Sequence, residues 1–302
     1  MTNATTVRVS AERSSRVVGK RPSTARPTGV RRPNIFGGLA ATFWLLIAIV
    51  PVYYVVITSL RTQQGFYDEN ALLPPSDPTF ENYAKVLQND FVQYFVNSLV
   101  VTLVTVVFSV SFALLASYAI VRGSKNSRAL RLTFSVFLLG LAIPLQAVII
   151  PVYLMITRAH LYDTLLALIL PSAAFALPLS IVILVNFLRD IPGELYEAMR
   201  VDGAGDFRTL VSLVLPLAKP SLMTVAIYNG LNVWNGFIFP LVLTQSPDKR
   251  VLPLALWSFK GEFTANVPAL LAAVVLSTLP ILVLYMFGRR QLLAGLTAGA
   301  GK

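Results

Sequence analysis

Three side chains that form hydrogen bonds recur at helical spacing within a stretch that has no charged residue. Tyr228, Asn232 and Asn235 stand at positions i, i+4 and i+7, so on a helix they share one face. One phenol and two amides suit the hydroxyl groups of a polar ligand. They suit a neighbouring helix equally well, because amides often join helices inside a membrane. The residues alone leave both interpretations open.

Gln146 is the fourth candidate for contact with a solute. It follows Pro144 closely in another stretch without charge. Because proline removes a backbone donor and bends or breaks a helix, we expect a hinge or a lining turn at this point. The candidate substrate pathway therefore consists of Gln146, Tyr228, Asn232 and Asn235.

The chain has few groups for catalysis or for binding a metal. It has no Cys, and His160 is its single histidine, which excludes thiolate zinc sites and histidine clusters. No Gly-x-x-x-x-Gly-Lys-Ser/Thr loop for the phosphates of ATP occurs. Gly203 and Gly205 begin a dinucleotide fingerprint, but Arg208 stands where its third glycine is needed. We predict no catalytic residue, no metal site and no cofactor bound by this chain.

The positions of the helices that carry these residues can be inferred from the intervals that have no charged residue. Of the 302 residues, 55% are hydrophobic and only 13% are charged, about half the charged share of an average soluble domain. Six intervals hold no Asp, Glu, Lys or Arg, namely 33–60, 91–121, 132–157, 164–188, 220–247 and 263–288. About 20 apolar residues cross a bilayer as a helix, whereas barrel strands alternate and take only about ten. We predict an all-α membrane protein with six transmembrane helices, at about 37–60, 94–121, 132–157, 164–188, 220–244 and 267–288 within a domain of residues 35–290.

Basic residues indicate the orientation of these helices. Nineteen of the 25 Lys and Arg residues lie in the N-terminal tail, the second and fourth connections and the C-terminal tail. Since Lys and Arg concentrate in cytoplasmic segments, we expect a multi-pass protein of the cytoplasmic membrane with both termini inside. Residues 1–34 are expected to be a disordered basic tail and residues 291–302 a second cytoplasmic tail. The net charge of +11 is spread over four segments, which argues against nucleic acid as a partner, because that needs one dense basic face.

The connection of residues 189–219 is too polar to enter a membrane and is patterned as two helices. Pro192 suits the start of a helix that ends at Gly203, and Asp206 suits the cap of a second helix. The apolar face of the first helix consists of Leu195, Ala198, Met199 and Val201. Such a helix can dock against another protein or rest on lipid headgroups, and the residues by themselves favour neither.

The stretch from Glu197 to Pro220, EAMRVDGAGDFRTLVSLVLPLAKP, resembles the cytoplasmic-loop signature of ATP-binding-cassette (ABC) importer permeases. The residues in register with that signature are Glu197, Ala198, Asp202, Gly203, Ala204, Phe207, Leu215, Pro216 and Pro220. Residues 232–244 resemble the fifth-span motif of carbohydrate permeases, and residues 295–302 resemble their C-terminal tail. Two positions depart from the pattern: Met199, where the family usually has Ala, and Gly236, where an acidic residue is common.

The resemblance implies the type I importer fold, as in the second permease of maltose-type, binding-protein-dependent systems. It also implies a second permease as partner in a heterodimer, two cytoplasmic ATPase subunits that use ATP and Mg²⁺, and an extracytoplasmic solute-binding protein. The ATPases would be coupled through residues 192–206, and the residues implied at this contact are Glu197, Ala198, Asp202, Gly203, Ala204, Leu215 and Pro216. Residues 246–266 would face the binding protein. The solute would be a mono- or oligosaccharide.

Several alternatives stay open. An importer of the same class could carry a glycerol phosphate or a polyol. A secondary carrier fits six proline-broken spans, yet it typically needs ionisable groups inside the membrane, and the six intervals have none. A membrane scaffold would explain a docking helix but not the loop signature. The connection of residues 61–90 is either an extracytoplasmic binding surface or a simple connector.

Overall fold

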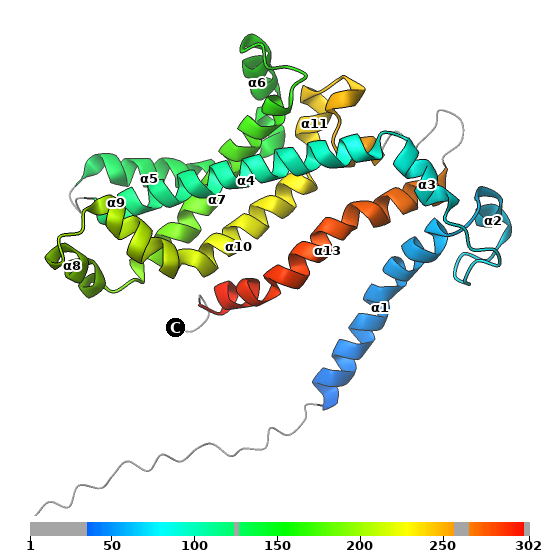
Figure 1. The fold of residues 1–302 in the computed structure, drawn as a ribbon, viewed down its shortest axis with the longest axis horizontal. Helices are drawn as coiled ribbons and strands as arrows, with labels where there is room; N and C mark the ends of the chain where they lie inside the picture. The colour runs from blue at the N-terminus through cyan, green and yellow to red at the C-terminus, as the bar shows by residue number, and fades with distance from the viewer. Residues whose placement is uncertain (1–34, 124–126, 257–265, 299–302) are drawn as a thin grey trace, which may run out of the picture. The chain divides into compact units, whose positions relative to one another are not determined.

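A computed structural model describes residues 35–123, 127–256 and 266–298 of the chain. Within these ranges every regular element is a helix (Figure 1). In chain order they are α1 (Ile35–Ser59), α2 (Gln63–Asp68), α3 (Glu81–Gln88), α4 (Phe91–Arg122), α5 (Arg128–Gly140), α6 (Leu145–Arg158), α7 (Leu165–Arg189), α8 (Gly193–Val201), α9 (Asp206–Thr209), the π-helix η1 (Leu210–Val214), α10 (Leu215–Trp234), α11 (Ile238–Leu243), the 3-10 helix η2 (Pro247–Lys249), α12 (Leu252–Ala255) and α13 (Val267–Ala298). The predicted tail of residues 1–34 and the last four residues, 299–302, lie outside the described ranges, and the side chains of α13 are described as far as Met286.

The chain divides into two units, residues 1–48 and residues 49–302. In the first unit the described part is the apolar start of α1, in which Phe43 and Trp44 are exposed. The helices from α2 onward all belong to the second unit.

Within the described residues, five segments are long and apolar enough to cross a membrane: α1, α4, α7, the segment from Asp206 to Trp234, and the part of α13 from Val267 to Met286. A sixth crossing requires α5 and α6 together, and these two helices bend by 109° between Gly140 and Leu145. The span expected at 132–157 is therefore a broken one. Its break lies at the predicted hinge, Pro144, which is the N-cap of α6 and disfavours helical backbone at the residue before it. The prediction of an all-α protein with membrane-spanning helices is confirmed.

Small side chains allow α4 to pack closely against α7 and α10. Thr105, Ser109, Ala113 and Ser117 occupy every fourth position of α4 and are fully buried. Such a stripe lets helix backbones approach one another inside a membrane, and the Ser117 hydroxyl donates to the Ile181 carbonyl of α7 at 3.3 Å. The opposite side of α4 exposes large apolar side chains, namely Leu103, Val104, Val107, Phe108, Phe112 and Leu115. Apolar groups thus face outward, as a lipid solvent requires.

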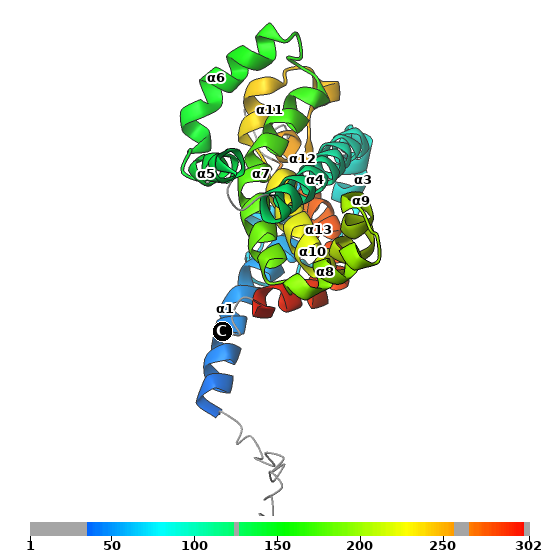
Figure 2. The ribbon, with the colours of Figure 1, turned by 90° about the vertical axis from the view of Figure 1, so that its left-hand side faces the viewer.

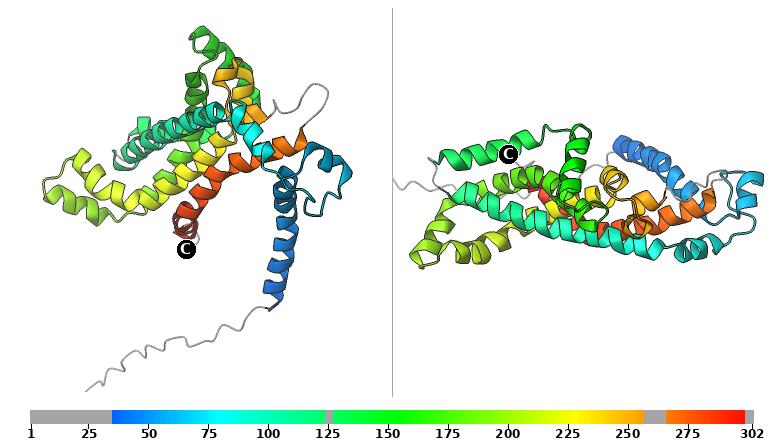
Figure 3. Two further views of the ribbon diagram at one scale, coloured as in Figure 1. Left: turned by 45° about the vertical axis from the view of Figure 1, so that its right-hand side comes forward. Right: turned by 90° about the horizontal axis from the view of Figure 1, so that it is seen from above.

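The connections lie at opposite ends of this bundle. Helices α8 and α9 are found at one end of α4, and α2 and α3 at the other (Figures 1 and 3). Figure 2 shows α5 and α6 as an arch beside α7, with α6 turning back toward α11. The two predicted polar connections, 61–90 and 189–219, are therefore separated by the length of the bundle.

The connection of residues 61–90 is folded around a buried arginine. Arg61 is only 1% exposed, and its guanidinium donates to the carbonyl of Asn70 at 2.7 Å and to that of Leu73. The Asn82 amide of α3 donates to the carbonyls of Ser59 and Arg61 at 2.9 and 2.7 Å. These bonds fix α2 and α3 against the end of α1, so the segment is ordered.

Candidate functional site

A cavity of about 410 Å³ lies where α10 ends and where the chain breaks between α5 and α6. Its walls come from α4, α7, α10, α11 and the α5–α6 break, and the lining residues include Ser98, Gly140, Ile143, Leu145, Ser172, Phe175, Tyr228, Asn229, Asn232, Gly236 and Phe239. Sites for small molecules typically enclose about 300–1,000 Å³ and combine a mostly apolar wall with a few polar groups. The cavity has both properties.

The structure brings two of the four candidate pathway residues together. Tyr228 and Asn232 line the cavity, whereas Asn235, the C-cap of α10, borders a smaller hollow beside Trp234 and Ser277. Gln146, on the first turn of α6, is exposed and lies outside the described lining. The Asn232 amide donates to the Tyr228 carbonyl of its own helix at 2.8 Å. Within the described chain, Asn232 therefore makes no bond to another helix.

Asn229 is the residue of α10 that joins helices, and the sequence pattern missed it. It is 2% exposed, and its amide donates to the hydroxyls of Ser109 on α4 and Ser180 on α7 at 3.3 and 2.9 Å. Asn229 also lines the cavity. The sequence held one signal, a second Asn three residues before Asn232, but nothing in it identified the serines of two other helices as partners.

The polar and aromatic groups of the cavity wall could hold a sugar. Neither the Tyr228 hydroxyl nor the Asn232 side-chain carbonyl has a hydrogen-bond partner within the described residues, so both are available to a ligand. Phe175 and Phe239 meet edge to face, with ring centroids 5.8 Å apart, and both line the cavity. Sugar rings present hydroxyls at their edges and C–H groups on their faces, which match amides and aromatic rings respectively.

Helix α8 at the opposite end ends in a left-handed glycine. Gly203 has φ 73°, its N–H bonds to the Arg200 carbonyl at 3.0 Å, and the Ala204 N–H bonds to the Met199 carbonyl at 2.9 Å. This pair of bonds is the Schellman motif, in which glycine avoids the steric cost of the left-handed conformation. The predicted helix end at Gly203 is confirmed. The start differs slightly, because Pro192 is the N-cap and α8 begins at Gly193.

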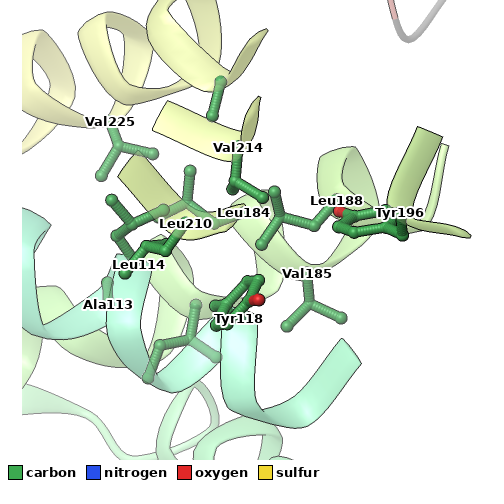
Figure 4. Close-up of a cluster of buried hydrophobic side chains, with 12 residues drawn as sticks. Ala113, Leu114, Tyr118, Leu184, Val185, Leu188, Tyr196, Leu210, Val214 and Val225 are labelled. Atoms are coloured by element: carbon green, nitrogen blue, oxygen red, sulfur yellow. The ribbon is translucent and has the colours of Figure 1, made fainter. Parts of the chain in front are cut away.

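The buried side of α8 is not the predicted apolar face. Tyr196 is the residue that enters the core, at 3% exposure, in a cluster with Leu188, Val214 and Tyr118 (Figure 4). The Arg122 guanidinium, at the end of α4, lies 4.2 Å from the centroid of the Tyr196 ring. Burial raises the pKa of the Tyr196 phenol, so the ring stays neutral beside this cation. Tyr196 thus anchors α8 to α4 and α7.

The side of α8 that faces away from this anchor carries Glu194, Glu197, Ala198 and Val201, at positions i, i+3, i+4 and i+7. All four are exposed, and Val201 is 87% exposed. We refer to these four residues as the docking face. Asp202 and Gly203, just beyond it, are also exposed, whereas Ala204 is buried. Of the predicted apolar face, Leu195, Ala198 and Val201 are exposed, as a face for a partner or for lipid headgroups requires, and Tyr196 is the residue of α8 that the core buries.

The second helix of this connection begins at Asp206, with Gly205 and not Asp206 as its N-cap. The Asp206 carbonyl accepts a bond from the Tyr118 hydroxyl of α4 at 3.2 Å. A π-turn, η1, follows and brings the Leu215 N–H to the Leu210 carbonyl just ahead of Pro216. Because proline has no N–H and clashes with a carbonyl four residues earlier, a wider turn suits this place. Leu215 and Pro216 are both exposed at the start of α10.

Two polar side chains fix the loop between α11 and α12. The Asp163 carboxylate accepts the N–H groups of Gln245 and Ser246 at 2.8 and 3.0 Å and also the Ser246 hydroxyl. These bonds, that of the Ser246 hydroxyl first, lower the pKa of Asp163 below its usual value. On α4, the Asn97 amide donates to the carbonyls of Asp248 and Arg250, each at 2.8 Å. The part of the predicted binding-protein surface at residues 257–265 lies outside the described residues.

A family model described as "Binding-protein-dependent transport system inner membrane component" matches residues 109–296. The chain belongs to this family. The match includes α8, α10 and most of the cavity wall. The permease is therefore a multi-pass protein of the cytoplasmic membrane and a transport subunit rather than an enzyme. Among its described residues, no three His, Cys, Asp or Glu side chains gather in a way that could hold a metal ion.

Named relatives agree with this assignment. The permease is 41% identical over 260 residues to "Putative ABC transporter permease protein ORF2" of Caldicellulosiruptor sp. (strain Rt8B.4), covering 86% of this chain and 94% of that protein. It is 32% identical to the diacetylchitobiose uptake system permease protein NgcG of Streptomyces coelicolor, over 85% of each chain. It is also 32% identical to the trehalose transport system permease protein SugB of Mycobacterium tuberculosis, over 88% and 99% of the two chains.

Two solved structures have the same fold. A chain of a bacterial ABC transporter involved in the import of the acidic polysaccharide alginate matches with a TM-score of 0.74 and 24% identity, over 88% of the permease and 99% of that chain. A second matches with a TM-score of 0.62 and 16% identity, over 84% and 92% of the two chains. It comes from an alginate transporter in complex with an alginate pentasaccharide-bound periplasmic protein. The predicted importer-permease fold is confirmed.

Proposed function

We propose that the permease is a membrane-spanning subunit of an ATP-driven importer that carries a mono- or oligosaccharide across the cytoplasmic membrane. Its proposed partners are a second, homologous permease, two cytoplasmic ATPase subunits that use ATP and Mg²⁺, and an extracytoplasmic solute-binding protein. The permease itself binds no nucleotide in this scheme, and both of its termini lie in the cytoplasm. The observation that carries the proposal is the uncharged cavity with free polar groups at Tyr228 and Asn232, in a chain whose relatives are named for sugar uptake.

Coupling to the ATPases is proposed to occur through residues 192–206. The docking face offers two carboxylates and two small or branched apolar groups, which suit a groove on another protein and fix the orientation of docking. Asp202, Gly203 and Ala204 complete this end, and Leu215 and Pro216 lead from it into α10. Movement of the ATPases would displace α8, and Tyr196 would pass the displacement to α4 and α7, because its ring packs between both helices.

The solute is proposed to pass the cavity on its way through the membrane. Tyr228 and Asn232 would bind sugar hydroxyls, and Phe175 would contact a ring face. Asn235, at the next turn beyond Asn232, and Gln146 remain proposed contacts outside the cavity, on a part of the path that the partner permease would complete.

Replacement of Asn232 by Ala tests the role of the cavity. In the importer reconstituted with its partner subunits and binding protein, Asn232→Ala should raise the half-saturation of sugar uptake roughly 2- to 10-fold, the value of one hydrogen bond. Thr224→Ala is a matched control, because Thr224 lies on the same helix, bonds to a backbone carbonyl four residues earlier as Asn232 does, and is absent from the cavity wall. Equal loss of uptake in both variants, or loss of assembly in Asn232→Ala, would contradict the role.

Replacement of Glu197 by Ala, or deletion of residues 197–203, tests the coupling. Uptake should fail while the separate ATPase subunits still fold and hydrolyse ATP. A secondary carrier would continue to transport after either change, and uptake that persists without ATP would therefore refute the proposed importer mechanism.

A further inference from the structure

The cavity wall has no formal charge. Among the described residues that line it there is no Asp, Glu, Lys, Arg or His. The lining segments of α4, α5, α7 and α10 all lie within the sequence intervals that have no charged residue. The polar groups that remain are the hydroxyls of Ser98, Ser172 and Tyr228 and the amides of Asn229 and Asn232.

Much of this polar capacity is already used inside the protein. The Ser98 hydroxyl accepts the Leu252 N–H at 2.8 Å, and the Asn229 amide is bonded to two serines. The groups left for a solute are the Tyr228 hydroxyl, the Asn232 side-chain carbonyl and the Ser172 hydroxyl. Neutral hydroxyls and a carbonyl can form hydrogen bonds with sugar hydroxyls, but none of them neutralises the charge of a carboxylate or a phosphate.

Gly236 adds no ionisable group to the wall, at a position where the fifth-span motif that the chain resembles commonly has an acidic residue. The fifth-span motif commonly has an acidic residue at this position, and Gly236 lines the cavity just after the end of α10. A side chain has little room in this conformation, because a Cβ on Gly236 would lie 3.0 Å from the Val233 carbonyl oxygen. The wall is therefore uncharged at this position as well.

From the uncharged wall we infer that the cavity selects neutral saccharides and rejects acidic or phosphorylated ones. The inference rests on the proposed function, since it specifies the solute that this cavity would pass. The fold alone does not decide the matter, because a transporter with the same fold is involved in the import of the acidic polysaccharide alginate. Selection must come from the side chains. A carboxylate that leaves water for a site without a cation loses its hydration and gains no partner.

The absence of cysteine gives a direct test of the charge preference. Ser172, which lines the cavity, is replaced by Cys in the full importer in liposomes. Labelling of the new thiol is followed as a mass shift of the permease, which has no other cysteine. Three thiosulfonate reagents are compared: neutral methyl, anionic sulfonatoethyl and cationic trimethylammonioethyl. Gln88→Cys, on the exposed end of α3, corrects for the intrinsic reactivity of each reagent.

Relative to that control, the neutral reagent should label Ser172→Cys at least about tenfold faster than either charged one, because an ion without a partner pays more than 1.4 kcal/mol on entering. Equal relative rates for the anionic and neutral reagents would overturn the inference. This comparison needs no knowledge of the natural solute.

Saccharides then test the selection itself. With binding protein present, trehalose or N,N′-diacetylchitobiose should slow the labelling of Ser172→Cys, and an alginate disaccharide should not. Equal protection by the alginate disaccharide would overturn the charge selection and leave sugar transport standing. If the intact importer takes up no saccharide of either kind, the proposed function itself fails, and the two failures are therefore distinguishable.

Discussion

Replacement of Tyr196 by Ala should separate ATP hydrolysis from transport. The Tyr196 ring is the anchor of α8, packed among the core side chains of α7 and η1 and covered by the Arg122 guanidinium at 4.2 Å. Truncating a buried aromatic side chain to Ala typically costs about 3–5 kcal/mol, and the lost cation–π contact adds about 1 kcal/mol. A cost of about 3 kcal/mol alone reduces the ratio of anchored to released α8 more than about 100-fold.

In the proposed importer, a released α8 would still present its docking face to the ATPase, because the four residues of that face lie on the other side of the helix from Tyr196. We therefore expect Tyr196→Ala to assemble and to retain ATP hydrolysis, while solute uptake per ATP falls at least about tenfold. The measurement is uptake and phosphate release in the same proteoliposomes. Arg122→Gln keeps the Tyr196 ring and removes the cation above it. It should lower the ratio of solute uptake to ATP hydrolysis less than Tyr196→Ala does, by about fivefold.

Tyr196→Phe is the matched control. The Tyr196 hydroxyl is buried and has no hydrogen-bond partner within the described residues, so its removal should leave coupling close to that of the natural protein. The reasoning is refuted if Tyr196→Phe is as damaging as Tyr196→Ala, or if Tyr196→Ala transports with an unchanged ratio.

Three further predictions concern the bonds that hold the bundle and its loops. Asn229→Ala should lower the stability of the purified permease by about 0.6–1.7 kcal/mol, the usual value of hydrogen bonds between membrane helices; an unchanged midpoint of denaturation would contradict the bonds to Ser109 and Ser180. Gly203→Ala should destabilise the end of α8 by about 1–2 kcal/mol, because the φ of Gly203 is positive. Gly203→Asn should destabilise it less. Faster hydrogen exchange of the Ala204 amide would measure both effects. Because the folded pKa of Asp163 lies below its ordinary value of 3.8, its hydrogen bonds stabilise the loop fully above pH 3.8, and this stabilisation is lost as the pH falls through the folded pKa. The Gln245 and Ser246 amides should therefore stay protected from hydrogen exchange at about pH 4 and lose this protection at lower pH. Asp163→Asn should abolish this dependence of the protection on pH.

The fold could be predicted from charge because the membrane forbids charged residues over about 20 consecutive positions. The intervals without charge located the long helices, and Pro144 located the break. The faces of the helices could not be predicted in the same way. In α8 the pattern grouped Leu195, Ala198, Met199 and Val201 as a face for a partner or for lipid headgroups. It did not identify Tyr196, whose ring packs into the bundle beside α7 and Arg122. Periodicity reports which residues share a side and not which side meets a partner.

The candidate site was predicted in part for a related reason. Tyr228 and Asn232 line the cavity as a shared helical face requires, but Asn235 stands where α10 ends and borders another hollow. Asn229, which bonds to two other helices, could not be separated from Asn232 by sequence, because both are amides in an uncharged stretch. Their roles differ through Ser109 and Ser180, which only the packing of α4 and α7 brings close.

The same bundle connects the two ends of the molecule that the proposed function needs. Helix α4 contributes Val101 to the cavity and Tyr118 to the cluster around Tyr196, and these residues are about 25 Å apart at 1.5 Å per helical residue. Between them, the stripe from Thr105 to Ser117 packs without large side chains, and Asn229 bonds α10 to both α4 and α7. In the proposed mechanism, a displacement of α8 would reach the cavity through these three packed helices. The opposite wall, at the break between α5 and α6, joins this trio by a different contact, the close approach of Gly140 to Pro178. A Cβ on Gly140 would lie 3.0 Å from the Pro178 ring, so Gly140→Leu should wedge that contact and impair uptake even where ATP hydrolysis and α8 are intact.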